Sequence, residues 1–252
     1  SISRPKDFWN KTALFFSGGD VNNTGELQQI YNANQSIMNN THNSNPLGGR
    51  AHHFYKTQNP LTNFGPYSLD IINSAIQEGS IYVSYIGHSG TQTWDNGVNS
   101  VSYLKNRFNN RHPLISDFGC STGKFAEPDI DAFGELFVRD INDGQAIAYL
   151  GNSSWGYLST SLRIPGLFYN NLIKDSILEI GEAHYQAKIE NFQGSGINDV
   201  NRVFMYCNIL FGDPIIRLEL PQKPNFIVTS SDILILETNI NESTDTVHFR
   251  IV

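Results

Sequence analysis

The sequence predicts a three-layer α/β/α domain with a mostly parallel sheet, followed by a short β segment. Short apolar runs alternate with amphipathic runs along most of the chain, which is typical of strands and helices that follow each other in an α/β domain. Three apolar runs, 81–86, 114–118 and 146–150, are apolar at nearly every position, as expected of strands covered on both faces. The 252 residues, 39% of them hydrophobic, suffice for one sizeable core.

The expected elements follow this alternation in chain order. The predicted strands cover 13–16, 53–55, 81–86, 114–118 and 146–150. The predicted helices between them cover 26–38, 67–77, 101–108 and 132–139. Pro66 suits the first turn of the second helix, and Gly79 suits its C-terminal end. Beyond the fifth strand come the runs 164–178, 183–189 (helical) and 200–210, and 215–220 has the pattern of a short strand.

Two prolines divide the chain near its end. Pro221 and Pro224 mark a linker, so residues 1–221 form the main predicted domain. The segment 222–252 has strand composition with polar turns, but it is too short to form its own core. We interpret it as the truncated beginning of an immunoglobulin-like β-sandwich domain, and we expect the chain to be part of a larger multidomain precursor.

Composition excludes several classes of partner. The formal charge of −7 provides no basic stripe for nucleic acid or an anionic membrane surface. Two cysteines, Cys120 and Cys207, are too few for a disulfide framework, and no apolar stretch approaches the length of a membrane span. The polar residues are mostly Asn, Ser and Thr, which is common in secreted and surface proteins.

The strongest functional signal is the placement of His88 and Cys120. Each follows an apolar strand run, and the 32 residues between them are about the length of one strand–helix–strand crossover. If the two strands are neighbours in a parallel sheet, their carboxyl ends meet at the edge where open α/β folds place their sites. A thiol beside an imidazole at that edge is a candidate cysteine-nucleophile site.

The chemistry of such a pair assigns the roles. Gly119 allows a tight turn that exposes the sulfur of Cys120, and a following helix N-terminus favours the thiolate. His88 serves as base for the thiol and as acid for the departing amine. The backbone N–H groups of Ser89 and Cys120 are the expected oxyanion donors. A lone cysteine at a strand end is more often packing, and Cys207, inside an apolar run, is expected to lie in the core.

Five motifs in order make the chain resemble the gingipain family of cysteine peptidases, within the caspase-like fold group, over about 9–220. They are the histidine block 85–90 followed by Trp94, the C-x-x-G-x-F block 120–125, the Phe133-Gly134-Glu135 helix start, the strand and Ser-rich loop from Gly144 to Trp155, and Phe211-Gly212-Asp213-Pro214. The family usually has Gly directly after His, whereas Ser89 stands here.

The resemblance also implies supporting residues, and this sequence departs from them. A glutamate after the first strand orients the histidine in the family; Ser17 stands at that position here, so either Asp20 replaces it or a backbone carbonyl orients His88. At the base of the specificity pocket the family's arginine-specific members carry an acid, and Gln28 stands here. Strict arginine specificity therefore does not carry over, unless Asp20 or Glu26 reaches the pocket.

Two tryptophans are candidates for the substrate pocket. The family match favours substrate contact for Trp155, and packing under a loop competes closely with a pocket role for Trp94. No metal or cofactor site is predicted. His52 and His53 point to opposite faces of a strand, and His184 is expected on a solvated helix face. A structural calcium at the acidic residues Glu127, Asp129 and Asp131 is less favoured than a solvated loop.

The sequence thus predicts a cysteine endopeptidase that acts on peptides or proteins through a thioester at Cys120. The predicted setting is bacterial and extracytoplasmic, that is, secreted, at the cell surface or periplasmic. The alternative is a surface or adhesive module that keeps the peptidase fold without activity, as Ser17 and Ser89 hint.

Overall fold

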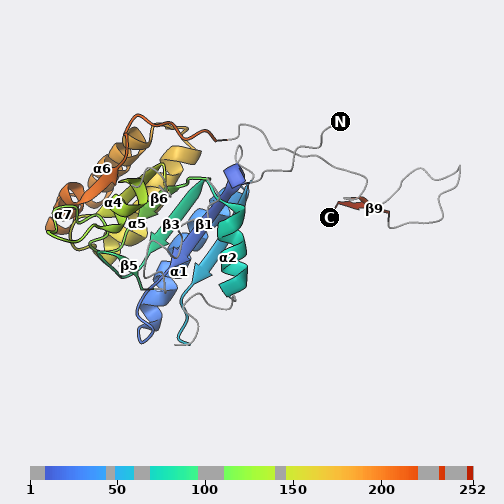
Figure 1. The fold of residues 1–252 in the computed structure, drawn as a ribbon, viewed down its shortest axis with the longest axis horizontal. Helices are drawn as coiled ribbons and strands as arrows, with labels where there is room; N and C mark the ends of the chain where they lie inside the picture. The colour runs from blue at the N-terminus through green and yellow to red at the C-terminus, as the bar shows by residue number, and fades with distance from the viewer. Residues whose placement is uncertain are drawn as a thin grey trace, which may run out of the picture. The chain divides into compact units, whose positions relative to one another are not determined.

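The computed structural model describes residues 9–43, 49–59, 69–95, 111–139, 146–220, 233–235 and 249–251. It divides into two units, Ser1–Gln222 and Lys223–Val252. The first unit holds the α/β domain (Figure 1). In the second, the described residues form one antiparallel pair, β9 (Ile233–Ile235) with β10 (Phe249–Ile251). The immunoglobulin-like nature of this second unit stays a prediction.

A six-stranded sheet forms the centre of the first unit. Its order is β2-β1-β3-β6-β7-β8, and every neighbouring pair is parallel except β7 with β8. The strands are β1 (Thr12–Ser17), β2 (Arg50–Tyr55), β3 (Tyr82–Ile86), β6 (Leu114–Asp117), β7 (Ala148–Asn152) and β8 (Asn208–Phe211). A separate short hairpin joins β4 (Ser89–Gly90) to β5 (Thr93–Trp94).

Helices cover both faces of the sheet, which gives the three layers. They are α1 (Thr24–Asn43), α2 (Leu69–Glu78), α4 (Phe133–Arg139), α5 (Leu158–Ile173), α6 (Ile180–Ser195) and α7 (Asp199–Cys207), after a 3-10 turn, η1 (Trp9–Lys11). Successive residues of a strand point to opposite faces, so Phe15 joins the core under α1 and α5 while Phe16 joins the core under α2 and α4. The prediction of a mostly parallel α/β/α domain is confirmed.

Most predicted elements form within a few residues of their expected ends, with informative exceptions. The run 200–210 is not one element, because α7 ends at Cys207 and β8 begins at Asn208. The predicted strand at 215–220 is wrong: within the described residues it makes only an isolated bridge, from Arg217 to Glu179. The predicted helix 101–108 lies outside the described residues. Among the helices the structure describes, none is long and apolar enough to cross a membrane.

The strand order places a crevice at the carboxyl ends of β1 and β3. From β1 the chain crosses to β2 on one side, and β3 then pairs with β1 on the other side. Loops that leave such strands in opposite directions open a crevice between them, where α/β folds bind ligands. The loop after β1, the loop after β3 and the loop after β6 all begin at this edge.

Candidate active site

Cys120 follows β6 on a turn that a buried carboxylate holds. Oδ1 of Asp117 accepts a hydrogen bond of 2.7 Å from the N–H of Gly119, and its Oδ2 accepts from Trp94 Nε1 and Tyr149 Oη at 2.6 and 2.8 Å. Burial raises the pKa of Asp117 to about 6, although these hydrogen bonds favour its charged form. Side chains from β5, β6 and β7 (Trp94, Asp117 and Tyr149) thus fix the turn at Gly119, directly before Cys120.

Among the described residues, the sulfur of Cys120 has one close donor. The backbone N–H of Gly156, in the loop between β7 and α5, donates to Sγ at 3.3 Å. A hydrogen bond from an N–H stabilises the negative charge of a thiolate. The next residue, Ser121, has a φ of 64°, a left-handed conformation that is uncommon for any residue but glycine. Such a turn directly after a strand exposes the sulfur at the edge of the sheet.

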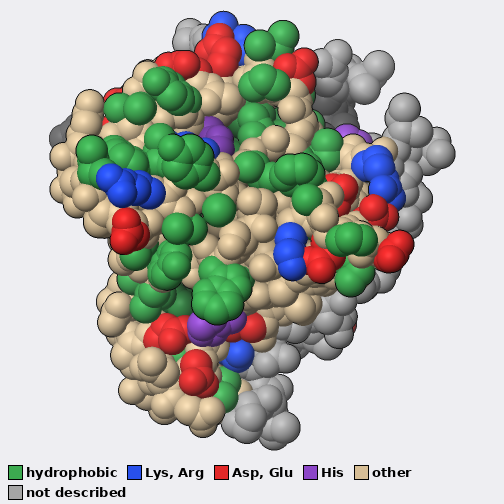
Figure 2. All heavy atoms as spheres, turned by 90° about the vertical axis from the view of Figure 1, so that its left-hand side faces the viewer, with side chains coloured by type: hydrophobic (Ala, Val, Ile, Leu, Met, Phe, Trp, Pro, Cys, Tyr) green, Lys and Arg blue, Asp and Glu red, His purple; other side chains and the backbone are tan. Residues whose placement is uncertain are grey.

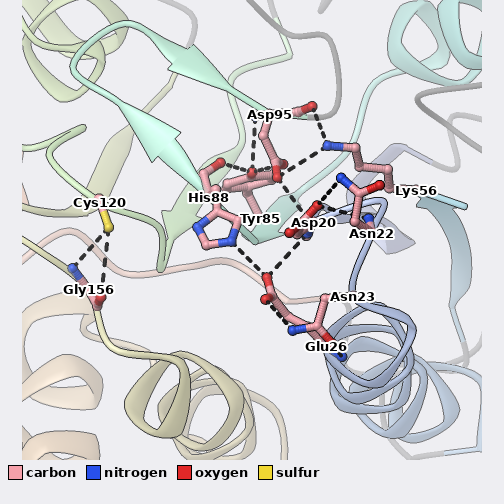
Figure 3. A network of polar contacts seen from close by, with 11 residues as sticks. Asp20, Asn22, Asn23, Glu26, Lys56, Tyr85, His88, Asp95, Cys120 and Gly156 are labelled. Carbon is pink, nitrogen blue, oxygen red and sulfur yellow. Dashed lines mark hydrogen bonds and ion pairs between the residues drawn. The ribbon is translucent and has the colours of Figure 1, made fainter. Parts of the chain in front are cut away.

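His88 lies on the loop after β3, the strand that pairs directly with β6. Its Nε2 lies 2.8 Å from Oε1 of Glu26, in the first turn of α1 (Figure 3). This contact leaves the other ring nitrogen, Nδ1, for the thiol or the substrate. The His88 side chain is 60% exposed, whereas the Glu26 side chain is only 14% exposed. The carboxylate therefore contacts the imidazole on the side that faces the protein.

The Glu26 carboxylate is held by the turn that begins its helix. Oδ1 of Asn23 accepts from the N–H of Glu26 at 3.1 Å, and the Glu26 carboxylate accepts from Asn23 Nδ2 and from the N–H of Asp20. Asn23 is thus the N-cap of α1 and Glu26 stands three residues on, as in a capping box, but the Glu26 carboxylate accepts from the side chain of Asn23, whose backbone N–H donates to the Asp20 carbonyl. The sequence interpretation did not place Glu26 beside His88, and the Asn23-x-x-Glu26 spacing is the signal that would have located this helix end.

The backbone N–H of Asp95 and the hydroxyl of Tyr85 hold the backbone of His88. The N–H of Asp95 donates to the carbonyl of His88 at 3.1 Å, and the hydroxyl of Tyr85 also donates to that carbonyl. Asp95 in turn accepts from the N–H of Gly19 at 2.9 Å and pairs with Lys56. A side chain at Gly18 would collide with Asp95, since its Cβ would lie 1.9 Å from Oδ1, so this network requires the glycine.

His88 and Cys120 line one cavity of about 80 Å³. Its walls come from α1, the loops after β3 and β6, and the start of α5; they are Glu26, Ile30, Ile86, Gly87, His88, Phe118, Gly119, Cys120, Gly156, Leu158 and Ser161. Four of these are large apolar side chains, and Glu26 contributes the carboxylate. His88 and Cys120, the two residues singled out from the sequence, therefore border the same cavity at this edge of the sheet.

The structure corrects the residues predicted to orient His88. The hydroxyl of Ser17 is buried and bonds His53 Nε2 and Asn34 Nδ2, both at 2.8 Å, on the other side of β1 from His88. The side chain of Asp20 accepts from Asn22 in its own turn. Neither side chain touches His88. Glu26 takes this place because the capping interaction turns its side chain toward the crevice.

Two predicted pocket residues also lie elsewhere. Gln28 is exposed, bonds Asn32, and lines a different cavity, of about 340 Å³, between α1 and the end of β2. One residue position along a helix turns a side chain by about 100°, so Gln28 and Glu26 cannot share a face. Trp94 is 1% exposed and stacks on Tyr85 at 4.5 Å between ring centres, so it packs under the histidine loop. His184, expected to be solvated, is also buried.

The remaining predicted residues sit at the mouth of the site. Trp155 is 73% exposed; it does not line the cavity, but its neighbours Gly156 and Leu158 do. Figure 2 shows a face of the molecule on which a large hydrophobic side chain lies directly against a histidine that is flanked by acidic groups. The hydroxyl of Ser89 donates to the carbonyl of Cys120 at 2.7 Å, a role for its side chain that the sequence did not predict.

The described acidic residues give no cluster of three potential metal ligands. Asp131 is paired with Arg139, which lowers the pKa of this carboxyl, and Glu127 is paired with Lys124. A structural calcium at Glu127, Asp129 and Asp131 would have to compete with these cations, and it stays a prediction.

The fold and this edge of the sheet define an α/β/α protein of the caspase-like type with a Cys–His pair. The chain belongs to peptidase family C25, whose model matches residues 2–219, and the resemblance to the gingipain family is confirmed. A comparison with curated proteins found no match.

Solved structures show the same fold at low sequence identity. The Arg-specific cysteine proteinase gingipain R is 16% identical with a TM-score of 0.65, covering 85% of this chain and 49% of that chain. The complex of Porphyromonas gingivalis RgpB pro- and mature domains is 18% identical with a TM-score of 0.66, and the match covers 90% of this chain and 55% of that chain. A structure described as a protease is 18% identical with a TM-score of 0.64, and the match covers 84% of this chain and 49% of that chain. The chain thus spans about half the length of these structures.

Proposed function

We propose that this domain is a cysteine endopeptidase in which Cys120 is the nucleophile, His88 the acid–base partner and Glu26 the residue that orients His88. One observation carries the proposal: Cys120 and His88 line a single cavity while Glu26 fixes the far nitrogen of the imidazole. The same constellation of nucleophile, base and orienting group recurs in nucleophilic hydrolases. Membership of peptidase family C25 supports the proposal independently.

The steps follow from these positions. With its Nε2–H donating to Glu26, neutral His88 presents Nδ1 to the thiol and removes its proton. The Cys120 thiolate attacks the scissile carbonyl carbon and a tetrahedral oxyanion forms. The C–N bond then breaks as His88 returns the proton to the leaving amine, which leaves a thioester on Cys120. A water molecule, deprotonated by His88, hydrolyses the thioester and regenerates the thiol.

The cavity beside Cys120 suits the side chain that precedes the scissile bond. Its walls are mainly apolar, and both oxygens of its one carboxylate already accept hydrogen bonds, Oε1 from Asp20 N–H and Oε2 from Asn23, while Oε1 also contacts His88. A carboxylate engaged in this way has little capacity left for a guanidinium. We therefore propose a preference for small uncharged residues, with exposed Trp155 contacting the substrate outside the cavity.

We place the protein outside the cytoplasm of a bacterium, as part of a larger precursor, acting on proteins or peptides. The family supports this setting, and a relative has been solved as a complex of its pro- and mature domains.

An alkylating active-site probe tests the proposal most directly. In a Cys207→Ala background, which leaves one thiol, the probe should label Cys120 stoichiometrically, and His88→Ala should slow the labelling. Absence of labelling in the folded protein would favour the non-enzymatic module. Labelling that does not depend on His88 would show that the two residues do not act together.

A further inference from the structure

A buried asparagine holds the peptide bond that precedes the nucleophile. The carbonyl oxygen of Gly119 accepts a hydrogen bond of 2.6 Å from Nδ2 of Asn152, the last residue of β7. Because Asn152 is only 2% exposed, this carbonyl is directed into the protein. The C=O and N–H of a planar trans peptide point in opposite directions. The N–H of Cys120, which belongs to the same peptide unit, is therefore directed away from Asn152.

The Cys120 amide is available as a donor. Within the part of the chain that the structure describes, the N–H of Cys120 makes no hydrogen bond, whereas the two carbonyls around it are both taken, that of Gly119 by Asn152 and that of Cys120 by Ser89 Oγ at 2.7 Å. Gly119 and Cys120 both border the cavity. The carbonyls of Gly119 and Cys120 are thus both held by hydrogen bonds, and the N–H of Cys120 is left as a free donor beside the cavity.

Two further buried side chains determine which way Asn152 faces. Oδ1 of Asn152 accepts at 2.8 Å from Nδ2 of Asn208, its register partner on β8. Since the amide nitrogen of Asn208 is the donor there, its Oδ1 must accept from His184, whose Nε2 lies 2.7 Å away. Donors and acceptors alternate along this chain, so the amide nitrogen of Asn152 can only face Gly119. Asn208 is fully buried and His184 is 7% exposed.

The imidazole at the end of the chain is held neutral. Burial, together with the charge of nearby Lys188, lowers the pKa of His184 to about 3. Lys188 itself donates to the carbonyls of Met205 and Asn208. Asn208 therefore contacts the Lys188 cation through its backbone and His184 through its side chain. A neutral imidazole with its hydrogen on Nε2 is the form that this arrangement requires.

We propose that Asn152 is a positioning residue for the oxyanion site: it holds the Gly119–Cys120 peptide so that the Cys120 N–H donates to the oxyanion of an acylation intermediate, and Asn208 and His184 hold Asn152 in the required orientation. The inference rests on the proposed function in one respect, since Cys120 must be the nucleophile for its amide to face the oxyanion. It does not depend on cleavage of any particular peptide.

Two small reagents that attack the same sulfur test this role. With p-nitrophenyl acetate, the Cys120 thiolate forms an S–C bond through a tetrahedral oxyanion, and p-nitrophenolate leaves with the electron pair. With iodoacetamide, the thiolate displaces iodide directly and no oxyanion forms. Because loss of an oxyanion donor costs roughly 100- to 1,000-fold, misalignment of one in Asn152→Ala should slow acylation by about 10- to 100-fold and leave alkylation essentially unchanged.

The chain contains a matched control. Asn201 is equally buried, its Nδ2 donates to the carbonyl of Gly196 at 2.8 Å, and its Oδ1 accepts from Asn191 at 3.0 Å, so it repeats the bonding of Asn152 away from the cavity. Asn201→Ala, in the same Cys207→Ala background as the other variants, should leave both rates unchanged. If Asn152→Ala does not fold, Asn152→Asp keeps the shape and the acceptor for Asn208 while removing the donor to Gly119.

The outcomes separate the inference from the proposed function. A parallel loss of acylation and alkylation, an equal loss in Asn201→Ala, or no loss at all overturns the role of Asn152. So does a parent protein that is alkylated at Cys120 but is not acylated by the ester. A protein that shows the selective loss but hydrolyses no peptide retains the Asn152 inference and loses the proposed peptidase function.

Discussion

Nε2 of His88 lies 2.8 Å from Oε1 of Glu26, a contact that joins the loop after β3 to the first turn of α1. The same carboxylate accepts from Asn23 Nδ2 and Asp20 N–H in the turn before α1, so one side chain serves both the fold and the candidate base. The position of His88 therefore depends on where α1 begins. A substitution that alters this end of the helix should also change the orientation of the imidazole.

Glu26→Gln should lower kcat by roughly 10- to 100-fold with little change in KM, because the amide keeps the side-chain shape and the backbone N–H that Asn23 caps but removes the charge that stabilises imidazolium. Steady-state kinetics on a peptide substrate measure this. Glu182→Gln is the control, since Glu182 occupies the first turn of α6 and, within the described part of the chain, accepts only from Gln186. Equal activity of the Glu26 variant and the parent would show that Glu26 has only a capping role.

Cys120→Ala should abolish hydrolysis while the free energy of unfolding changes by less than about 1 kcal/mol, because a partly exposed strand-end thiol contributes little to the core. His88→Ala should behave alike, since its side chain is 60% exposed. Activity assays and thermal melts of the two variants check this. A Cys120→Ala protein that unfolds would identify the residue as structural.

Asp117→Ala should lower the free energy of unfolding by about 2 to 4 kcal/mol, because it leaves buried donors on Trp94 and Tyr149 without an acceptor. Urea denaturation at pH 7 measures the loss. Asp213→Ala is the control, since this exposed carboxylate accepts, among the residues that the structure describes, only from the N–H of Ile215. Comparable losses in the two variants would mean that the buried network does not stabilise the turn before Cys120.

The contrast between Cys120 and Glu26 indicates what sequence patterns can predict here. Cys120 and His88 follow apolar strands, and the edge at which parallel strands end is fixed by topology, so their meeting was predictable. Glu26 reaches the site through the start of a helix, and that depends on which turn caps α1. The burial of Trp94 and His184 is not predictable from the sequence, because it depends on packing between distant segments: Trp94 lies against Tyr85 and Phe133, and His184 against Phe168 and Asn208.

His184 makes the stability of the fold depend on pH. Its pKa is about 3 in the folded protein and about 6.5 when unfolded, so between these values the unfolded chain binds more protons and stability falls as pH falls. His184→Gln keeps a donor for Asn208 but does not titrate. Relative to this variant, the parent should lose about 3 kcal/mol between pH 7 and pH 4, since each pKa unit corresponds to about 1.4 kcal/mol.

Urea denaturation of both proteins across this pH range measures the difference. His53, whose pKa burial lowers to about 4, and Asp117, whose pKa is raised, also titrate, but they are common to both proteins and cancel. Parallel stability curves for the parent and His184→Gln would show that His184 does not carry this dependence.

The last prediction concerns the residue before the scissile bond. The apolar walls of the cavity and its engaged carboxylate should favour small uncharged side chains over Lys and Arg. A library of fluorogenic peptides varied at this one position measures the preference.

Leu158→Glu, which adds a free carboxylate at a wall residue that is 40% exposed, should raise cleavage after Lys and Arg. Gln28→Glu is the matched control and should change nothing, because Gln28 lines the other cavity. Exclusive cleavage after Arg by the unmodified protein would show instead that Glu26 binds the substrate side chain and does not serve His88 alone.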